Sequence, residues 1–330
     1  MHTGLIILGR PGFEQIYGDE HQRTIASRIK LLAPSMTREE AMKHPDLLEQ
    51  AEVIFCGWGG PIMDERFLTM TPRLKAVFYG AGSIRAYVTE AFWARGIVIT
   101  SAYAANAVPV AEYTNGVIML SLKNFWFHAQ QIKHTSRLTE RIPCAGGFGS
   151  RVGIISLGMI GRLVCQKLRD TDLEIFAYDP YVNPDEADRL GVKLVSLDDI
   201  FRECDVVSLH TPRLKETEGM ICGRHFELMK PRATFINTAR GAVVNEPEMI
   251  DALQRRPDVS AVLDVTWPET PVSGSPLYTL PNVVLTPHIA GSLDRECRRM
   301  GRLMIEEFDR WERGEPMRWA VSEQYSLTMA

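Results

Sequence analysis

From residue 151 onward, short apolar runs alternate with helical stretches, and this alternation constrains the fold more than any other feature of the chain. The runs contain few polar positions, which is typical of strands covered on both faces of a sheet. Repeated strand–helix–strand succession predicts βαβ units and a parallel sheet. We expect strands at 151–156, 173–179, 205–210, 233–237, 260–265 and 282–285. We expect helices at 159–169, 197–203, 218–229 and 247–255.

The first hundred residues show a second, similar pattern. Apolar runs at 5–8, 53–56 and 75–79 are bounded by polar, glycine or proline positions and predict three further strands. Residues 107–122 predict a long helix that is hydrophobic on almost every side, which we expect to be buried at a domain or subunit interface. A last helix is expected over 293–313, where the chain returns to the first domain.

Length and composition fit a soluble protein of two domains, since 330 residues exceed the ~150 typical of one. With 37 Lys and Arg against 41 Asp and Glu, the formal charge is −4, so no broad nucleic-acid-binding surface is expected. No apolar run reaches the ~18 residues of a membrane span, and the first is too short for a signal peptide. The six cysteines are scattered without C-x-x-C spacing, so neither a disulfide framework nor a metal site is predicted. A cytoplasmic location is therefore expected.

The first strand of the second block runs into a tight turn and a helix, a context typical of dinucleotide-binding sites. Ser156 occupies the first position of the G-x-G-x-x-G pattern, and Gly158 and Gly161 occupy the other two. Glycine at the second position lets the backbone approach a pyrophosphate, and glycine at the third lets the helix pack closely on its strand. The amino end of the helix, with Met159 and Ile160, favours the phosphates.

An acidic residue follows the next strand, at the place expected for a ribose ligand. Asp179 lies about 20 residues after the glycine turn, where a carboxylate accepts hydrogen bonds from the ribose of NAD. Its charge disfavours the 2′-phosphate of NADP, and Pro180 and Tyr181 follow it in place of an arginine. Two alternatives stay open on these residues alone. One is S-adenosylmethionine, bound in methyltransferases by a similar geometry, and the other is a simple strand-to-helix turn.

Three side chains further along suit carboxylate binding and proton transfer. Arg240 follows the strand at 233–237, and its planar donors can hold a carboxylate in two parallel bonds. His288 follows the strand at 282–285, and imidazole can exchange the proton that accompanies a hydride transfer. Glu269 lies in a preceding loop, where a carboxylate bonded to the imidazole would fix its tautomer. Taken singly, a surface arginine and a structural histidine are equally ordinary interpretations.

Five segments together resemble the D-isomer-specific 2-hydroxyacid dehydrogenase family, in its order and spacing and over nearly the whole chain. They are the glycine turn, His210-Thr211-Pro212, and the segments at 237–241, 264–269 and 285–291. The resemblance implies an α/β fold of two Rossmann-like domains with doubly wound parallel sheets. In this fold the NAD domain is inserted into a flavodoxin-like substrate domain. The implied boundaries are 1–101 with 297–330 for the substrate domain and 102–296 for the NAD domain.

The same resemblance implies residue roles. Arg240 becomes the arginine that binds the substrate carboxylate and carbonyl, and His288 with Glu269 becomes the acid/base pair. Asp264 resembles the residue that bonds the nicotinamide carboxamide. His210, itself a rival acid/base candidate, is expected to line the cofactor or to pack in the core. The expected cofactor-binding set is Ser156, Gly158, Met159, Ile160, Gly161, Asp179, His210, Thr211, Pro212, Thr238, Ala239, Asp264, His288 and Gly291.

A glycine-rich loop after the strand at 75–79 is the candidate for binding the substrate. It consists of Gly80, Ala81, Gly82 and Ser83. In the family the amides of this loop form a nest for the substrate carboxylate, although a simple glycine-rich turn explains the residues equally well. Ile84 stands where the family usually has an aspartate, and Tyr113 replaces the usual histidine. Asn106 matches an asparagine that faces the active site in some relatives.

The resemblance implies an NAD-dependent oxidoreductase acting on a small D-2-hydroxy acid or 2-keto acid. It also implies a homodimer through the cofactor domain, with no metal, nucleic-acid or membrane partner. Some relatives instead sense NAD(H) as corepressors or scaffolds and keep the same three side chains, so that alternative stays open. At this length we expect no additional regulatory domain of the kind that some phosphoglycerate dehydrogenases carry. The substrate side chain is expected to depend on the segments near Gly59, Ile84, Trp93 and Trp267.

Overall fold

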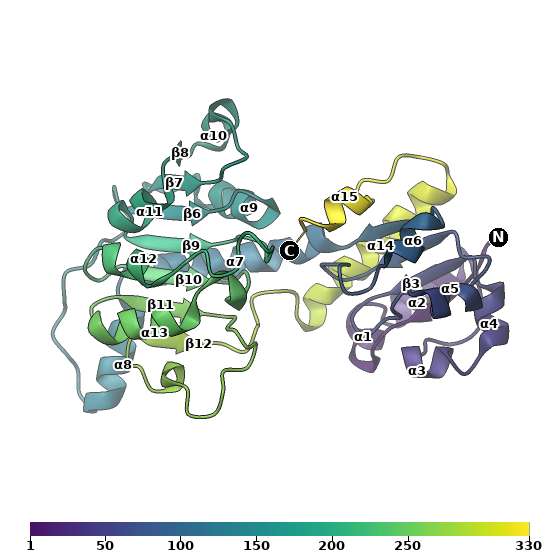
Figure 1. Cartoon of the computed structure of the whole chain (residues 1–330), viewed down its shortest axis with the longest axis horizontal. Helices are drawn as coiled ribbons and strands as arrows, with labels where there is room; N and C mark the ends of the chain where they lie inside the picture. The colour runs from purple at the N-terminus through teal and green to yellow at the C-terminus, as the bar shows by residue number, and fades with distance from the viewer. Residues whose placement is uncertain (330) are drawn as a thin grey trace. The chain divides into compact units, whose positions relative to one another are not determined.

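The computed structural model describes residues 1–329, which form two compact units (Figure 1). The terminal unit comprises Met1–Asn106 with Ser292–Met329, and the central unit comprises Ala107–Gly291. The chain passes from one unit to the other at 106/107 and 291/292. The boundaries implied by the family resemblance were 101/102 and 296/297. The assignment of the terminal unit to the substrate stays a prediction. Within the described range, no helix is both long and apolar enough to cross a lipid bilayer.

The terminal unit contains a five-stranded parallel sheet in the order β2-β1-β3-β4-β5. Its strands are β1 (Thr3–Ile7), β2 (Lys30–Leu31), β3 (Val53–Cys56), β4 (Ala76–Tyr79) and β5 (Val98–Ser101). This strand order is that of flavodoxin, so the expected flavodoxin-like fold is confirmed. β2 and β5 were not predicted, because runs of two and four residues give too little periodicity to recognise.

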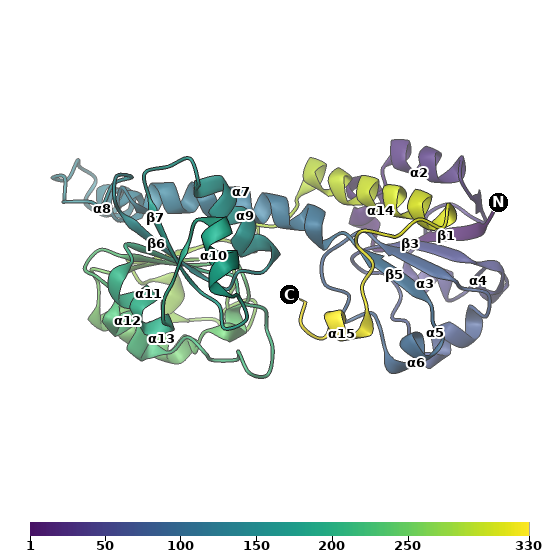
Figure 2. The same cartoon turned by 90° about the horizontal axis from the view of Figure 1, so that it is seen from above.

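Helices cover both faces of this sheet, because alternate strand residues point to opposite sides. They are α1 (Arg10–Gln15), α2 (Asp19–Ala26), α3 (Arg38–Ala41), α4 (Pro45–Gln50), α5 (Glu65–Met70), α6 (Glu90–Ala94), α14 (Cys297–Glu312) and α15 (Glu323–Ser326). Figure 2 shows α2 and α14 on one face, with α4, α5 and α6 on the other. Phe55 and Phe78 pack with Phe308 of α14, whereas Ile54 and Val77 belong to the core of the opposite face.

The central unit contains a seven-stranded parallel sheet in the order β12-β11-β10-β9-β6-β7-β8. Its strands are β6 (Arg151–Ile155), β7 (Glu174–Tyr178), β8 (Lys193–Leu194), β9 (Val206–Leu209), β10 (Thr234–Asn237), β11 (Ser260–Leu263) and β12 (Val283–Leu285). The chain moves outward from β6 to β8 and then returns to the other side of β6 with β9. This reversal is the doubly wound topology, which places ligands at the carboxyl ends beside the switch. All six strands expected from the sequence are present, with shorter ends.

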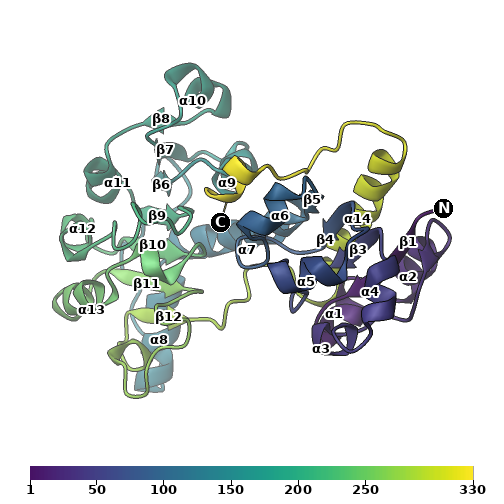
Figure 3. The same ribbon diagram turned by 45° about the vertical axis from the view of Figure 1, so that its right-hand side comes forward.

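Helices cover both faces of the central sheet as well. They are α7 (Tyr103–Ser121), α8 (Phe125–Thr135), α9 (Met159–Leu168), α10 (Pro184–Leu190), α11 (Leu197–Glu203), α12 (Gly223–Leu228) and α13 (Glu246–Arg255). Short 3₁₀ turns lie at Gly241–Val243, Pro276–Tyr278 and Asp294–Glu296. Figure 3 shows α11, α12 and α13 on one side of the strands. The core of the other face includes residues of α7 and α9.

Two expected helices have other bounds in the structure, and one helix was not expected. The helix expected over 218–229 begins only at Gly223, because residues 215–219 form a turn and Ile221 forms a parallel bridge with Val244. α8 was not predicted at all. α7 begins at Tyr103, earlier than expected, and Met119 and Leu120 near its end are 39% and 40% exposed.

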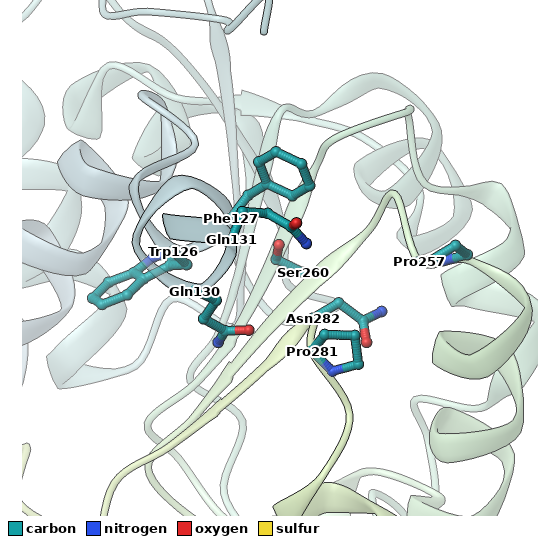
Figure 4. A pocket seen from close by; sticks show the side chains of 8 residues that line it. All are labelled: Trp126, Phe127, Gln130, Gln131, Pro257, Ser260, Pro281 and Asn282. Carbon is teal, nitrogen blue, oxygen red and sulfur yellow. The ribbon is translucent and has the colours of Figure 1, made fainter. Parts of the chain in front are cut away.

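A small pocket lies beside α8 at the amino ends of β11 and β12 (Figure 4). Its volume is about 140 Å³. It is lined by Trp126, Phe127, Gln130, Gln131, Pro257, Ser260, Pro281 and Asn282. Because ligands of parallel sheets bind at the carboxyl ends of the strands, this pocket lies at the wrong edge to be the cofactor site.

Candidate active site

The carboxyl ends of β10, β11 and β12, three neighbouring strands, lead to Arg240, Glu269 and His288. Nδ1 of His288 forms a hydrogen bond with the Glu269 carboxylate. The same carboxylate acts electrostatically on the Arg240 guanidinium. The structure therefore brings together the three side chains that the sequence singled out, although their catalytic roles stay predictions.

The His288–Glu269 pair is open to solvent, with the two side chains 50% and 55% exposed. Because Glu269 accepts at Nδ1, the neutral ring carries its proton there and leaves the Nε2 lone pair free. No other described residue bonds to Nε2. A ring held in this way can take up a proton at Nε2 and then be stabilised by the carboxylate behind it.

The loop that carries His288 is held by Asp264, which is only 2% exposed. Its carboxylate accepts hydrogen bonds from Ile289 N at 2.8 Å, Ala290 N at 2.9 Å and the Thr286 hydroxyl at 2.6 Å. Its carbonyl oxygen accepts from His288 N at 3.0 Å. These bonds maintain His288 at φ +54°, a conformation that L-residues rarely adopt. The carboxamide role expected for Asp264 stays a prediction, with about one of four acceptor positions left for it.

Tyr113 extends this network from α7. Thr286 donates its single hydroxyl proton to Asp264, so the 3.1 Å contact between the two hydroxyl oxygens must have Tyr113 as the donor. Burial raises the pKa of Tyr113, which keeps this donor protonated at neutral pH. The tyrosine that replaces the family's usual histidine therefore supports the His288 loop through Thr286.

Arg240 lies on a tight crossing of two loops and is only partly exposed. A Cβ on the adjacent Gly241 would lie 2.0 Å from the backbone of Thr266, so only glycine permits this approach. Nη1 of Arg240 donates to the Ala239 carbonyl at 2.6 Å, and no other described residue accepts from the guanidinium. Burial lowers the pKa of Arg240 while Glu269 raises it. A charged fork with free donors in this position fits a carboxylate ligand.

The glycine turn fits the pyrophosphate of a dinucleotide. Ser156 adopts φ +77°, the left-handed conformation that the first glycine of the pattern normally supplies. Gly158 is the N-cap of α9 and no side chain caps this helix, so its first amides are free. A Cβ on Gly158 would meet nothing within 4 Å, whereas one on Gly161 would lie 2.1 Å from the Ser156 carbonyl oxygen. The turn therefore leaves space for a ligand beside Gly158, whereas at Gly161 it leaves no space for a side chain.

These two glycines give a matched prediction. Gly161→Ala is expected to lower the stability of the central unit by at least the ~1–3 kcal/mol typical of overpacking, because the methyl group meets backbone. Gly158→Ala is expected to leave Tm unchanged, since its methyl group meets no other atom of the protein. It is expected to weaken NADH binding, because the methyl group occupies the space where the pyrophosphate is expected. Calorimetry and NADH fluorescence titration measure both quantities. Equal Tm values for the two variants would contradict the close approach at Gly161.

Asp179 directly follows β7, as expected for a ribose ligand. Its Oδ2 accepts from Leu157 N at 2.8 Å and its Oδ1 from Tyr181 N at 2.9 Å. Each oxygen retains a second lone pair, which leaves the carboxylate able to accept from ribose hydroxyls. The bond to Leu157 also ties this carboxylate to the glycine turn.

The end of β9 carries two buried polar atoms that lack a partner among residues 1–329. They are Nδ1 of His210 and Oγ1 of Thr211, and they lie on the strand next to β6 at the topological switch. Nε2 of His210 contacts the Ser208 hydroxyl at 3.0 Å. Unpaired buried donors or acceptors are costly, so this position fits a polar ligand such as the cofactor.

His210 is a poor acid/base candidate, because burial lowers its pKa to about 3 and keeps the ring neutral. Above the unfolded pKa near 6.5 this has no cost, but below it only the unfolded chain takes up the proton. Stability of the central unit should therefore fall by about 2 kcal/mol between about pH 7.5 and about pH 5 from this group. Denaturant unfolding of His210→Gln should lack this part of the loss, and an unchanged pH slope would contradict it.

The remaining predicted cofactor residues lie at the same edge of the sheet. The Thr238 hydroxyl contacts the Thr114 hydroxyl at 3.1 Å, and Ala239 N donates to Asn237 Oδ1 at 3.0 Å. Pro212 accepts at its carbonyl oxygen from the Thr217 hydroxyl, and Gly291 is the last residue of the central unit. These contacts shape the loops, and their cofactor contacts stay predictions.

The loop Gly80–Ser83 of the terminal unit follows β4. The amide of Gly80 donates to Cys56 O at 2.7 Å and that of Ala81 to Tyr79 O at 2.9 Å. Within the described chain, the amides of Gly82 and Ser83 have no acceptor. The amide of Gly80 is thus bonded to β3 and that of Ala81 within the turn, so only the amides of Gly82 and Ser83 are free to bind an anion. The substrate-binding role of the four residues stays a prediction.

Asn106 lies next to this loop within the terminal unit. Its Nδ2 is 3.7 Å from the position of a Cβ on Gly82, and its Oδ1 accepts from Ser292 N at 2.9 Å. The structure thus brings together Gly82 and Asn106, two residues predicted to bind substrate. Ile84 is fully buried in the core, which explains why an apolar residue stands there.

A doubly wound sheet, a ligand-ready glycine turn and a terminal acidic residue define the central unit as a Rossmann-type dinucleotide-binding unit. Residues 115–290 match the family model described as "D-isomer specific 2-hydroxyacid dehydrogenase, NAD binding domain". The chain therefore belongs to the D-isomer specific 2-hydroxyacid dehydrogenase family. The match also confirms NAD as the cofactor predicted from the sequence.

Sequence relatives include D-3-phosphoglycerate dehydrogenases. That of Archaeoglobus fulgidus is 32% identical over 228 residues, which cover 69% of this chain and 43% of the relative. That of Methanocaldococcus jannaschii is 28% identical over 285 residues, covering 86% and 53%. The chain thus spans about half the length of the curated relatives it matches.

Solved structures share the fold across both units. A D-isomer specific 2-hydroxyacid dehydrogenase from Lactobacillus delbrueckii ssp. bulgaricus, solved in an NAD-complexed form, has a TM-score of 0.79 at 22% identity, covering 97% of this chain and 100% of that one. A phosphoglycerate oxidoreductase from Rhizobium etli has a TM-score of 0.80 at 21% identity, covering 97% and 98%. These likenesses confirm the predicted fold class.

Proposed function

We propose that this protein is an NAD-dependent dehydrogenase that transfers hydride between NAD(H) and a small D-2-hydroxy acid or 2-keto acid. The observation that carries this proposal is the hydrogen bond between His288 and Glu269 beside Arg240, within an NAD-binding unit. A proton carrier, its carboxylate partner and a free guanidinium are the groups that reduction of a keto acid requires.

Each residue has a role in the proposed reaction. NADH, when bound, supplies the hydride. The free donors of Arg240 bind the substrate carboxylate and polarise its carbonyl. His288 gives the proton at Nε2 to the new alkoxide, and Glu269 stabilises the charged ring before transfer. In the terminal unit, the free amides of Gly82 and Ser83 bind a carboxylate, with Asn106 beside them.

The experiment is NADH oxidation with glyoxylate, hydroxypyruvate, pyruvate and phenylpyruvate, and NAD⁺ reduction with 3-phosphoglycerate. Turnover of any of them supports the dehydrogenase. NADH binding without turnover of any supports the corepressor or scaffold alternative instead. Repeating the best reaction with NADPH tests the charge of Asp179, and a preference for NADPH would contradict the assigned ribose contact.

A homodimer through the central unit and a cytoplasmic location are further parts of the proposal. Met119, Leu120 and Phe125 are 39%, 40% and 44% exposed around the α7–α8 connection, which gives an apolar surface for association. All six cysteines are free, as suits a reducing compartment. Analytical ultracentrifugation of the wild type and of Leu120→Glu tests the dimer, which the charge should weaken. A wild-type monomer would refute it.

A further inference from the structure

Trp267 is a 50% exposed indole two residues before Glu269. The guanidinium carbon of Arg213 lies 4.0 Å from the centre of its ring, a close cation–π contact. Arg213 is itself held by Glu218, whose Oε1 accepts from Nε at 2.8 Å. An exposed indole with a fixed cation over one face is restrained in a way that simple surface packing does not require.

The backbone of this segment has two further anchors. Trp267 N donates to Oε2 of Glu246 at 2.9 Å, and Glu246 lies at the start of α13. The buried Thr266 hydroxyl lies 2.8 Å from the Pro268 carbonyl oxygen and 2.9 Å from that of Glu269. The turn that ends at Glu269 is therefore fixed on both sides of the indole.

The anchors come from three different strand ends. Arg213 follows β9, Glu246 follows β10 and Trp267 follows β11, and these strands are neighbours in the sheet. The Arg213–Trp267 contact therefore spans from β9 to β11 across the end of β10, the strand that leads to Arg240. We call this pair the Trp267 strap.

We propose that the Trp267 strap positions the Glu269 carboxylate for its hydrogen bond to His288. Glu269 and His288 are both half exposed, so little packing holds them, and their meeting depends on the two loops. Asp264 fixes the loop of His288, and the strap fixes the loop of Glu269. Arg240 acts electrostatically on Glu269, whereas the Asp264 carboxylate is bonded to the amides of Ile289 and Ala290. The catalytic consequence of the strap rests on the proposed function, but the geometry does not.

The first test measures the hydrogen bond between His288 and Glu269 and does not require turnover. With ¹⁵N-labelled histidine under alkaline conditions, NMR shows which ring nitrogen of His288 carries the proton, and His288→Gln identifies the signal. The wild type should hold it on Nδ1, toward Glu269. In Trp267→Leu and Arg213→Met the proton should shift toward Nε2, because the carboxylate is no longer held. Trp267→Phe keeps a ring for Arg213 and should restore the wild-type pattern.

The second test measures kcat with the keto acid that the wild type reduces fastest. Trp267→Leu and Arg213→Met should lower kcat by about 10- to 100-fold, the size expected for a misplaced catalytic group, with an unchanged Kd for NADH. The double variant should lose no more than either single one, since both break one strap.

Matched controls remove similar side chains elsewhere on the central unit. Arg255→Met breaks the exposed pair with Glu227, and Phe148→Leu trims an 86% exposed ring. Neither should change the tautomer or kcat. A wild-type tautomer in both strap variants would overturn the proposal, even if Tm falls. If the wild type turns over no substrate, the proposed function fails while the tautomer still decides the role of the strap.

Discussion

Replacing His288 with glutamine is expected to lower kcat for keto-acid reduction by about 10²–10⁴-fold, the usual contribution of a positioned proton donor. Glutamine keeps hydrogen-bonding capacity at a similar length but cannot transfer a proton at neutral pH. The hydride step then leaves an alkoxide without a donor. Steady-state rates under saturating NADH and substrate measure the effect.

The control for this prediction is cofactor binding. His288 and Glu269 are half exposed and lie outside the core, so His288→Gln should preserve Tm. The Kd for NADH should change far less than kcat, because the expected contact of His288 with the cofactor is one of many. Glu269→Gln should also lower kcat, by less, because the ring survives but loses the charge that supports it. Turnover within about twofold of the wild type in His288→Gln would show that another group supplies the proton.

Replacing Arg240 with glutamine is expected to lower kcat/KM by roughly 30- to 5,000-fold, which corresponds to the 2–5 kcal/mol lost when a desolvated charge pair is truncated. Arg240 places its guanidinium next to Glu269. Apart from the bond from Nη1 to Ala239, the guanidinium donors have no acceptor among the described residues. The loss should therefore appear in both KM and kcat, because the same group binds the carboxylate and polarises the carbonyl.

Arg240→Lys separates charge from geometry. Lysine keeps the positive charge but has no planar fork, so it should recover only part of the lost kcat/KM. The Kd for NADH should stay near the wild-type value in both variants, since the glycine turn lies on a different strand. Full activity in Arg240→Lys would mean that charge alone suffices and that two-point binding of the carboxylate is wrong.

The sequence predicted the fold well where strands are fully buried. Runs such as those of β6 and β9 are apolar throughout, so their pattern and their order directly indicate a parallel sheet. Prediction from the sequence failed where pairing between residues that are distant along the chain determines the local structure. The bridge between Ile221 and Val244 joins residues on two loops, and no local pattern shows that it shortens the helix after β9.

In the candidate site as well, some residues could be predicted from the sequence and others could not. Arg240, Glu269 and His288 could be found because each follows a recognisable strand and belongs to a known motif. The role of Asp264 as the anchor of the His288 loop, and the contact of Arg213 with Trp267, could not. Both depend on where neighbouring strand ends meet in three dimensions. The free amides of Gly82 and Ser83 likewise emerge only once the partners of Gly80 and Ala81 are known.

The insertion of the central unit has a consequence for biosynthesis. Phe308 of α14 packs 5.5 Å from Phe78 and 5.7 Å from Phe55, measured between ring centres. The ribosome makes β3 and β4 early but α14 only after the whole central unit. The part of the terminal sheet that α14 covers must therefore stay exposed during translation, although α2 on the same face is made early, while the central unit already has all its strands. A nascent chain stalled after Gly291 should accordingly have a protease-resistant central unit and a protease-sensitive amino-terminal segment.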